Sequence, residues 1–229
     1  VPMVELRSGV EKFTVIQAWD LVQSGNATIV DLRGPSDFAH GHAQGALNLP
    51  YSEKGLEDRL RLLLEPQSSV ILIVETPEKV EGALSQLIGG AFSVAGVIEE
   101  SMEAWQDDGL PSEVLTEVSI TQLAKEVATG KIVVLDVREP LEWEMGHVPG
   151  ALLVSLGTLR ERLHELPQES GITVICEAGV RSSAAASILQ AHGFVGVVNV
   201  PEGTAGYRNT NLPLQFTEAD SNIEKDTEK

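Results

Sequence analysis

Residues 134–151, VLDVREPLEWEMGHVPGA, repeat residues 29–46, IVDLRGPSDFAHGHAQGA, and this repetition decides the fold. The two stretches lie about 105 residues apart, which is too long for the unit of a solenoid and fits a small domain. We therefore interpret the chain as a duplicated domain. The positions that are identical in the two copies are Asp31, Arg33, Pro35, Gly41, His42, Gly45 and Ala46, matched by Asp136, Arg138, Pro140, Gly146, His147, Gly150 and Ala151.

Helix and strand signals alternate along each copy. In the second copy, Ser119 precedes Gln122 by three residues, which indicates a capping box, and Gly130 indicates the end of that helix. Such alternation favours an α/β fold in which each copy forms a mainly parallel sheet flanked by helices. We expect domains over 10–112 and 113–216, followed by a disordered acidic tail over 217–229. The other elements expected in the second copy are strands over 132–136, 151–155, 172–175 and 197–200, a short helix after Pro140, and helices over 157–166 and from Ser182 to Gly193.

Cys176 is the single cysteine of the chain, and it directly follows the strand expected over 172–175. Residues 177–181 lead from this strand toward a helix with Ser182 at its N-cap position. A loop this short turns free backbone N–H groups inward, and together with the helix N-terminus they favour the thiolate, the reactive form of cysteine. A buried cysteine is more often a small apolar residue. The glycine, arginine and serine that follow Cys176 nevertheless favour a nucleophile.

The first copy departs from this pattern in the equivalent loop. Glu75 stands where the second copy has Cys176, and Pro77 removes a backbone N–H from the loop. Glu75, Glu78 and Glu81 would also repel an anionic sulfur species. We therefore predict that the first copy is inactive.

The composition restricts the classes of function. The formal charge of −18 argues against nucleic acids and anionic membrane surfaces as partners. The longest apolar runs, such as 70–74 and 132–135, are too short to cross a bilayer. One cysteine excludes an internal disulfide, makes a thiolate metal site implausible and suits a reducing compartment, so we expect a cytoplasmic protein. Because the chain begins at Val1, we expect a longer protein with a partner domain on the N-terminal side.

Both copies resemble rhodanese domains over nearly the whole chain except its two ends. The resemblance rests on the Asp-x-Arg and Gly-His-x-x-Gly-Ala elements of each copy, on the Cys-x-x-Gly-x-Arg-Ser loop of the second, and on the closing Leu-Pro pairs at 110–111 and 212–213. It implies a sulfurtransferase in which Cys176 accepts a sulfane sulfur as a persulfide from a small donor or a protein persulfide. A thiol or a cyanide-type acceptor then takes the sulfur, without metal or cofactor. The residues whose amides would hold the transferred sulfur are Glu177, Ala178, Gly179, Val180 and Arg181.

Several repeated residues have a structural interpretation. Arg138 is a further substrate-binding candidate because strand ends surround the site, but its recurrence as Arg33 favours an ion pair with the neighbouring aspartate. His42 and His147 also occur in both copies, so we interpret them as turn histidines bonded to backbone and not as catalytic bases. Three aromatic residues are expected to pack in the core: Trp105, Trp143 and Tyr207.

Two other functions stay open. A non-enzymatic tandem would carry sulfur or dock a partner protein through its first copy. A cysteine phosphatase or arsenate reductase would need a longer loop between cysteine and arginine, to surround a tetrahedral anion. Only four residues separate Cys176 from Arg181, and the smaller ring fits one sulfur atom better.

Glu177, directly after the nucleophile, bears on the choice of donor. A carboxylate roughly 6 Å away would oppose a dianion such as thiosulfate by on the order of 1 kcal/mol. Arg181 is the single basic residue of the loop over 177–181. We therefore expect thiosulfate to be a poor donor, and a bulkier or protein-borne persulfide to be preferred.

Overall fold

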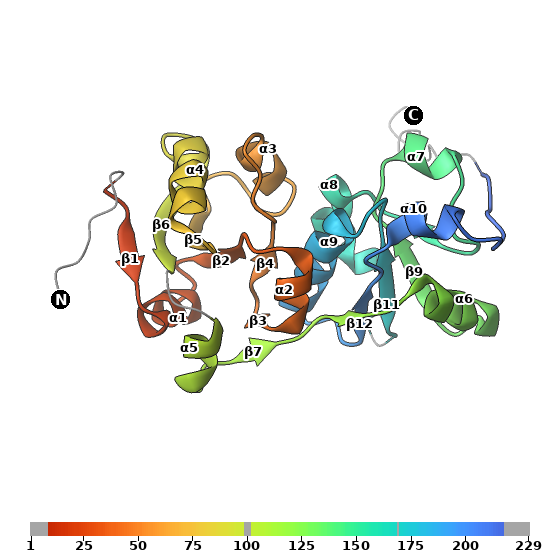
Figure 1. Cartoon of the computed structure of the whole chain (residues 1–229), viewed down its shortest axis with the longest axis horizontal. Helices are drawn as coiled ribbons and strands as arrows, with labels where there is room; N and C mark the ends of the chain where they lie inside the picture. The colour runs from red at the N-terminus through yellow and green to blue at the C-terminus, as the bar shows by residue number, and fades with distance from the viewer. Residues whose placement is uncertain (1–8, 99–101, 169, 218–229) are drawn as a thin grey trace, which may run out of the picture.

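The computed structural model describes residues 9–98, 102–168 and 170–217, which form two domains side by side along the long axis of the molecule (Figure 1). The first domain contains β1 (Glu11–Phe13), α1 (Val15–Gln23), β2 (Thr28–Asp31), α2 (Pro35–His40), β3 (His42–Ala43), β4 (Leu47–Asn48), α3 (Leu56–Leu60), β5 (Ser69–Ile73), α4 (Pro77–Leu87), β6 (Ser93–Ile98) and α5 (Met102–Asp107), and β7 (Ser112–Glu113) connects it to the second domain.

The second domain repeats this order. It contains β8 (Thr116–Glu117), α6 (Ile120–Thr129), β9 (Val133–Asp136), α7 (Pro140–Glu144), β10 (Leu152–Leu153), α8 (Leu156–Leu159), the 3₁₀-helix η1 (Arg160–Glu165), β11 (Ile172–Ile175), α9 (Val180–Ala191), β12 (Val197–Asn199) and α10 (Gly203–Arg208).

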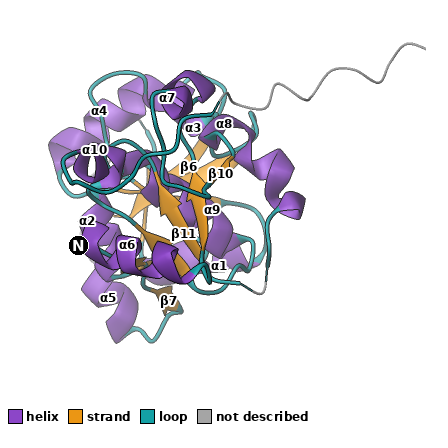
Figure 2. Cartoon of the chain, turned by 90° about the vertical axis from the view of Figure 1, so that its right-hand side faces the viewer, coloured by secondary structure: helices purple, strands orange, loops and turns teal. Residues whose placement is uncertain are grey.

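Each domain is built around a five-stranded sheet. The strand order is β1-β6-β5-β2-β4 in the first sheet and β10-β9-β11-β12-β8 in the second, which is the same order read from opposite ends. All neighbouring strands within these two sheets are parallel. Figure 2 shows the strands at the centre with helices around them. The prediction of a duplicated α/β domain with parallel sheets is confirmed.

The segment that closes each domain also folds in the same way twice. β7 pairs antiparallel with β3, and at the equivalent place in the second domain His147 pairs antiparallel with Gln215. The indole N–H of Trp105 donates to the carbonyl of Pro111 at 2.9 Å, and the hydroxyl of Tyr207 donates to that of Pro213 at 3.2 Å. Both aromatic rings are buried, as is that of Trp143, so the expectation that these residues pack is confirmed.

The Asp-x-Arg pairs tie the end of a strand to the Gly-His turn. Arg138 donates from Nε to both carboxylate oxygens of Asp136 at 3.0 Å, and its Nη2 donates to the carbonyl of Gly146 at 3.0 Å. Arg33 makes the same set of bonds in the first domain, with its Nη2 2.9 Å from the carbonyl of Gly41. The structural interpretation of this pair is therefore confirmed in both domains.

The repeated histidines are structural as well. The Nδ1 of His42 lies 2.8 Å from the carbonyl oxygen of Phe38, and the Nδ1 of His147 lies 3.0 Å from that of Trp143. Each imidazole also stacks on the aromatic ring of the residue whose backbone carbonyl it contacts. Burial lowers the pKa of both histidines, which favours the neutral form. The interpretation as turn histidines bonded to backbone is confirmed.

Two predicted helices differ from the structure in detail. Residues expected as one helix over 157–166 form the short helix α8 and then the 3₁₀-helix η1, in which Arg162 donates to Glu165 three residues later at 2.8 Å. This spacing matches the three residues per turn of a 3₁₀-helix. At the start of α6, Ser119 accepts from the amide of Gln122, but the Gln122 side chain donates to Glu126, so only half of the capping box forms.

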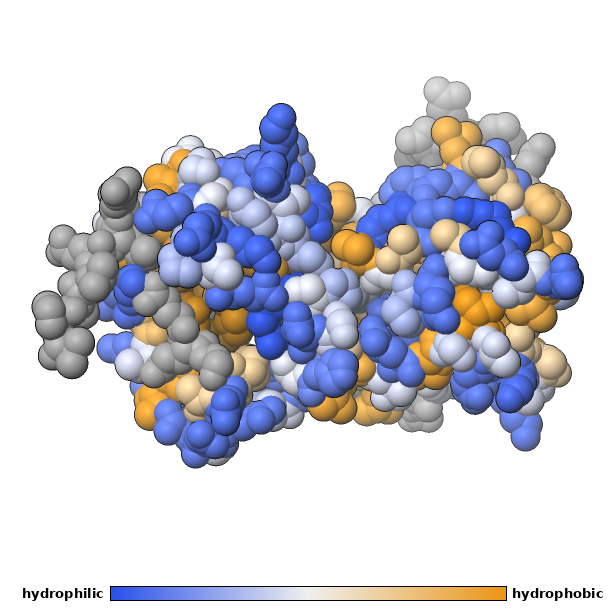
Figure 3. Space-filling view, in the orientation of Figure 1, coloured by the Kyte–Doolittle hydropathy of each residue, from blue (hydrophilic) through white to orange (hydrophobic). Residues whose placement is uncertain are grey.

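The core continues from one domain into the other. One cluster of buried apolar residues includes Leu47 and Leu49 of the first domain together with Ala185, Ile188 and Leu189 of α9. The face of the molecule seen in Figure 3 is mostly hydrophilic, in line with the acidic composition. In the part of the chain that the structure describes, no helix combines the length and apolar character needed to span a membrane. The tail predicted over 217–229 lies outside the described residues except for Thr217.

Candidate active site

Cys176 lies at the carboxyl end of the central strand of the second sheet. β11 is a run of four buried residues, all of them β-branched, and such side chains suit a strand covered on both faces. Cys176 follows its last residue, Ile175, and is only 1% exposed. Its carbonyl accepts the backbone N–H of Thr204 at 2.8 Å, so the nucleophile candidate sits on a fixed backbone.

The helix after the loop begins earlier than predicted. α9 starts at Val180 with Gly179 as its N-cap, whereas the sequence analysis placed Ser182 at the N-cap. Gly179 has a φ of 81°, a left-handed conformation open to glycine, and its carbonyl accepts the amide of Ser183 at 3.1 Å. Ser182 is instead the third residue of the helix, buried, with no hydrogen-bond partner for its hydroxyl among the described residues. The loop therefore comprises residues 177–179, which brings the helix N-terminus closer to Cys176 along the chain.

Two glycines allow this loop to lie against the segment before α10. A Cβ on Gly179 would overlap the carbonyl oxygen of Pro201, and a Cβ on Gly203 would overlap the carbonyl oxygen of Glu177. Backbone thus lies against backbone on both sides of the contact. Larger residues at either glycine would push the loop away from its support.

The side chain of Arg181 is held by a carboxylate from another element. Its two terminal nitrogens each donate to Glu142 of α7 at 2.7 Å, a bidentate pair between residues far apart in sequence. The hydrogen bond from Arg181 lowers the pKa of Glu142 to about 2, and Glu142 in turn raises the pKa of Arg181. The pair joins the first turn of α9 to α7.

Glu177 is surrounded by donors. It accepts from the hydroxyl of Thr204 at 2.8 Å and forms an ion pair with Arg208, both on α10. The Nη1 of Arg138 lies 3.9 Å from Oε2 of Glu177, the oxygen that also accepts from Thr204. Burial alone would raise the pKa of Glu177, but these hydrogen bonds outweigh it and leave the pKa below its ordinary value. The repulsion expected from the sequence is therefore reduced, because the carboxylate has cationic partners.

The structure places the predicted site residues of 176–181 in the loop over 177–179 and at its two ends, and their side chains differ in exposure to solvent. Cys176 and Gly179 are buried, whereas Ala178 and Val180 are exposed to solvent. Arg138 is buried beneath the loop and reaches it through Glu177. The roles of these residues in binding sulfur stay predictions.

Sequence reasoning missed three residues that hold the loop, namely Glu142, Thr204 and Arg208. They come from α7 and α10, and nothing in the local sequence connects them with Cys176. By the strand register, Lys79 takes the position of Arg181 in the first domain, where it pairs with Glu75 of its own loop.

The equivalent loop of the first domain has another construction. The predicted match of Glu75 with Cys176 is wrong, because Ile73 pairs with Asp31 as Ile175 pairs with Asp136. Val74 therefore takes the position of Cys176, and Glu75 takes that of Glu177 and forms an ion pair with Lys79. Thr76 caps α4 by accepting the amide of Lys79 at 3.4 Å, and Pro77 occupies the first helical position without an N–H. These contacts support the prediction that the first domain is inactive.

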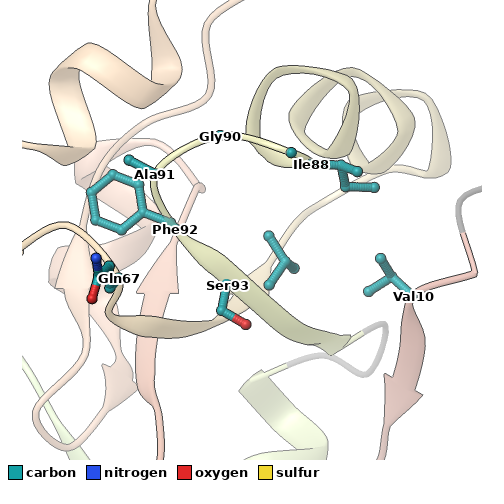
Figure 4. A pocket seen from close by; sticks show the side chains of 9 residues that line it. Val10, Gln67, Ile88, Gly90, Ala91, Phe92 and Ser93 are labelled. Carbon is teal, nitrogen blue, oxygen red and sulfur yellow. The ribbon is translucent and has the colours of Figure 1, made fainter.

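A pocket of about 530 Å³ lies in the first domain, away from Cys176 (Figure 4). Residues 88–94 line it together with Val10 and Gln67, and none of them is charged. Its described lining contains no thiol and no titratable side chain. We therefore do not assign the reaction to this pocket.

The second domain combines a parallel α/β sheet, a cysteine at the carboxyl end of the central strand, and a short loop into a helix N-terminus. The rhodanese-like domain family matches residues 14–108 and again residues 119–210. The chain belongs to the rhodanese-like family, as a tandem of two such domains.

Its relatives include proteins named for sulfur chemistry. The candidate sulfur carrier protein YrkF of Bacillus subtilis is 36% identical over 90 residues, which are 39% of this chain and 49% of that protein. A sulfurtransferase of Allochromatium vinosum is 27% identical over 101 residues, 44% of this chain and 94% of that protein. A rhodanese-related protein of Thermoplasma volcanium has a solved structure with a TM-score of 0.42 and 27% identity, covering 44% of this chain and 99% of the other. The chain thus matches about half the length of YrkF.

The glycine contact at the loop can be tested with two glycines at opposite ends of α9. Gly179 and Gly193 have φ values of 81° and 82°, but only a Cβ on Gly179 would meet other atoms within 4 Å. We expect Gly193→Ala to lower the free energy of unfolding by about 1 kcal/mol through backbone strain. Gly179→Ala should cost about 2 kcal/mol more because of the overlap with Pro201. Urea denaturation measures both, and equal losses would contradict the close approach.

The Arg181–Glu142 pair predicts a pH dependence of stability. The pKa of Glu142 falls from 4.5 to about 2 in the folded protein, so the pair stabilises the fold fully above pH 4.5 and loses this effect as the pH falls toward 2. Glu142→Gln should therefore lower the melting temperature at pH 7, and the difference from wild type should shrink as the pH is lowered. Thermal melts from pH 7 to about 3 measure it. Glu144→Gln, on the same helix, is the control; a difference that grows on acidification would contradict the assignment.

Proposed function

We propose that this protein is a sulfurtransferase in which Cys176 takes up a sulfane sulfur and passes it to a second nucleophile. The observation that carries the proposal is the position of the only thiol, at the end of the central strand and before the N-terminus of α9. Family membership and sulfurtransferase-named relatives support it. A free thiol that must stay reduced also suits a reducing compartment such as the cytoplasm.

The proposed reaction is a double displacement. The Cys176 thiolate attacks the outer sulfur of a donor, the new Sγ–S bond forms, and the donor's own bond to that sulfur breaks. The donor's remainder leaves with the electron pair. An acceptor thiolate or cyanide then attacks the terminal sulfur, the Sγ–S bond breaks, and the thiolate is regenerated. Backbone N–H groups near a helix N-terminus favour each anionic form of the sulfur.

The loop fits a sulfur atom better than a phosphate. Four residues separate Cys176 from Arg181, and both terminal nitrogens of Arg181 already donate to the carboxylate of Glu142. A phosphatase needs an arginine that is free to hold the tetrahedral anion. In this loop, release of Arg181 would cost a bidentate ion pair. Sulfur transfer makes no such demand on it.

The charges around the loop bear on the donor. Four charged side chains form two acid–base pairs, Glu142 with Arg181 and Glu177 with Arg208. We call these four side chains the rim of the loop. Such a rim has little net charge to attract a small dianion. Together with the formal charge of −18, this favours a donor whose affinity comes from contacts other than charge, such as a bulkier persulfide or one carried on a protein.

The mass of the intact protein tests the reaction class. We expect wild type to gain one sulfur atom on exposure to a persulfide donor and to lose it on addition of cyanide or a thiol. Cys176→Ser, which nearly preserves the volume of the side chain, should gain none and should keep its circular dichroism spectrum. Sulfur gain by the serine variant would overturn the assignment. A persulfide that forms and is not passed to any acceptor would favour a sulfur carrier.

The charge of Glu177 can be tested through thiosulfate. Glu177→Gln keeps an acceptor for Thr204 and removes the negative charge that pairs with Arg208, whereas Arg138 keeps its pair with Asp136. Because one unit charge at this range is worth on the order of 1 kcal/mol, we expect kcat/KM for thiosulfate to rise about threefold to tenfold at low salt. The gain should diminish as salt screens the charges.

Glu103→Gln, on α5 of the first domain, changes the net charge equally and serves as the control. It should leave the thiosulfate kinetics unchanged. Equal effects of the two variants, or no effect of Glu177→Gln at low salt, would show that charge at the rim does not set donor preference.

A further inference from the structure

The helix that follows Cys176 is buried on every side. Residues 182–189 of α9 are eight consecutive buried positions, whereas a helix at a domain surface normally leaves one face exposed. One side of α9 packs on β11 and β12 of its own sheet, and another side packs on β4 of the first domain. Figure 1 shows α9 and β4 next to each other where the two domains meet. The first domain therefore covers the helix that carries the candidate site at its start.

The hydrogen bonds between β4 and α9 are made by a single asparagine among the described residues. Asn48 is fully buried, and its backbone N–H donates to the hydroxyl of Ser187 at 3.0 Å. Its side-chain oxygen accepts the hydroxyl of Ser183 at 2.7 Å. The two serines lie one turn apart on the same face of α9. Because β4 is an edge strand of its sheet, these hydroxyls also occupy an edge that would otherwise be unpaired.

The other end of the Asn48 side chain is anchored in the first domain. Its amide nitrogen donates to the carbonyl of Asp31 at 3.2 Å and to that of Arg33 at 3.1 Å, at the carboxyl end of β2. Each polar atom of the side chain therefore has a partner. A fully bonded, buried amide resists displacement, because any shift leaves a donor or acceptor without a partner.

The contact leads directly to the loop after the nucleophile candidate. Ser183, whose hydroxyl binds Asn48, donates its own backbone N–H to the carbonyl of Gly179. Gly179 is the last residue of the loop that starts after Cys176. Asn48 is thus two hydrogen bonds away from that loop, although it belongs to the other domain.

This arrangement exists once in the duplicated chain. The position of Asn48 is occupied by Leu153 in the second copy, and by the strand register the positions of Ser183 and Ser187 are occupied by Glu81 and Ser85 in the first copy. The polar side chain next to Ser85, that of Gln86, bonds within its own domain, to the backbone of Leu56 and Ser52 at 3.0 and 2.9 Å. The polar contact therefore runs in one direction, from the predicted inactive domain to the helix of the active one.

We propose that Asn48 is a positioning residue for the chemistry at Cys176, and that the first domain serves to hold α9 and its loop in place. The proposal rests on the proposed sulfur transfer for its kinetic consequence. Asn48 does not touch the reacting sulfur. It fixes the first turn of α9, whose backbone closes the loop that would hold the transferred sulfur.

Variants of the full-length chain test the proposal from both sides of the bond. Asn48→Ala removes the amide, and Ser183→Ala removes only the hydroxyl that meets it. Loss of one buried hydrogen bond should raise the rate of amide hydrogen exchange in residues 178–184 about tenfold. The rate constant for sulfur uptake at saturating donor should fall about fivefold to tenfold, with the half-saturating donor concentration changed less than about twofold.

The double variant Asn48→Ala/Ser183→Ala completes a cycle. Because both single changes break the same bond, the double variant should be no slower than the worse single variant, within about twofold. Gln86→Ala is the matched control, since it removes a partly buried amide of the first domain that has no bond to α9. It should lower the melting temperature without changing exchange in residues 178–184 or the rate of sulfur uptake.

Three results would overturn the proposal. These are additive effects in the double variant, exchange and uptake in Asn48→Ala that match Gln86→Ala, or an effect confined to the half-saturating donor concentration. If wild type takes up no sulfur from any donor, the proposed function fails by itself. Hydrogen exchange then decides the positioning of the loop alone: faster exchange in both single variants supports it, and unchanged exchange refutes it.

Discussion

The loop after Cys176 depends on backbone lying against backbone. Gly179 and Gly203 lack the Cβ atoms that would overlap Pro201 and Glu177, so residues 177–179 can rest on the segment that leads into α10. Thr204 then reaches the carbonyl of Cys176. The side-chain contacts of Glu177 with α10, and of Arg181 with α7, require the loop to be in this place first. The arrangement of the site therefore depends on this close backbone contact, and the polar contacts of Glu177 and Arg181 add to it.

The two domains show how much chemistry can change on an unchanged frame. Both keep the strand order, the Asp-x-Arg pair, the stacked histidine and the closing Leu-Pro segment. One main difference lies between the central strand and its helix. In one domain a cysteine ends the strand and a glycine is the N-cap of the helix, whereas in the other a valine takes the position of the cysteine and a glutamate paired with a lysine precedes a proline at the helix start.

Much of this was readable from local sequence. The β-branched run before Cys176 predicted β11 with its observed bounds, and the duplication predicted the paired sheets. The N-cap of α9 was predicted three residues late, because a serine N-cap is the commoner signal and a glycine in the left-handed conformation took that place. Contacts such as Glu142 with Arg181, or Asn48 with Ser183, join residues distant along the chain. Neither partner carries a local pattern that names the other, so only the folded arrangement reveals them.

The small side chains of α9 have a consequence for evolution. Serine and alanine occupy positions 182–187, and they let the edge of another sheet come close to the helix. The buried face of α9 therefore fits the first domain and is poorly suited to contact with water. A gene rearrangement that separated the second domain from the first would expose this face of α9 to water. The two domains therefore form one structural unit, although only one of them contains a thiol.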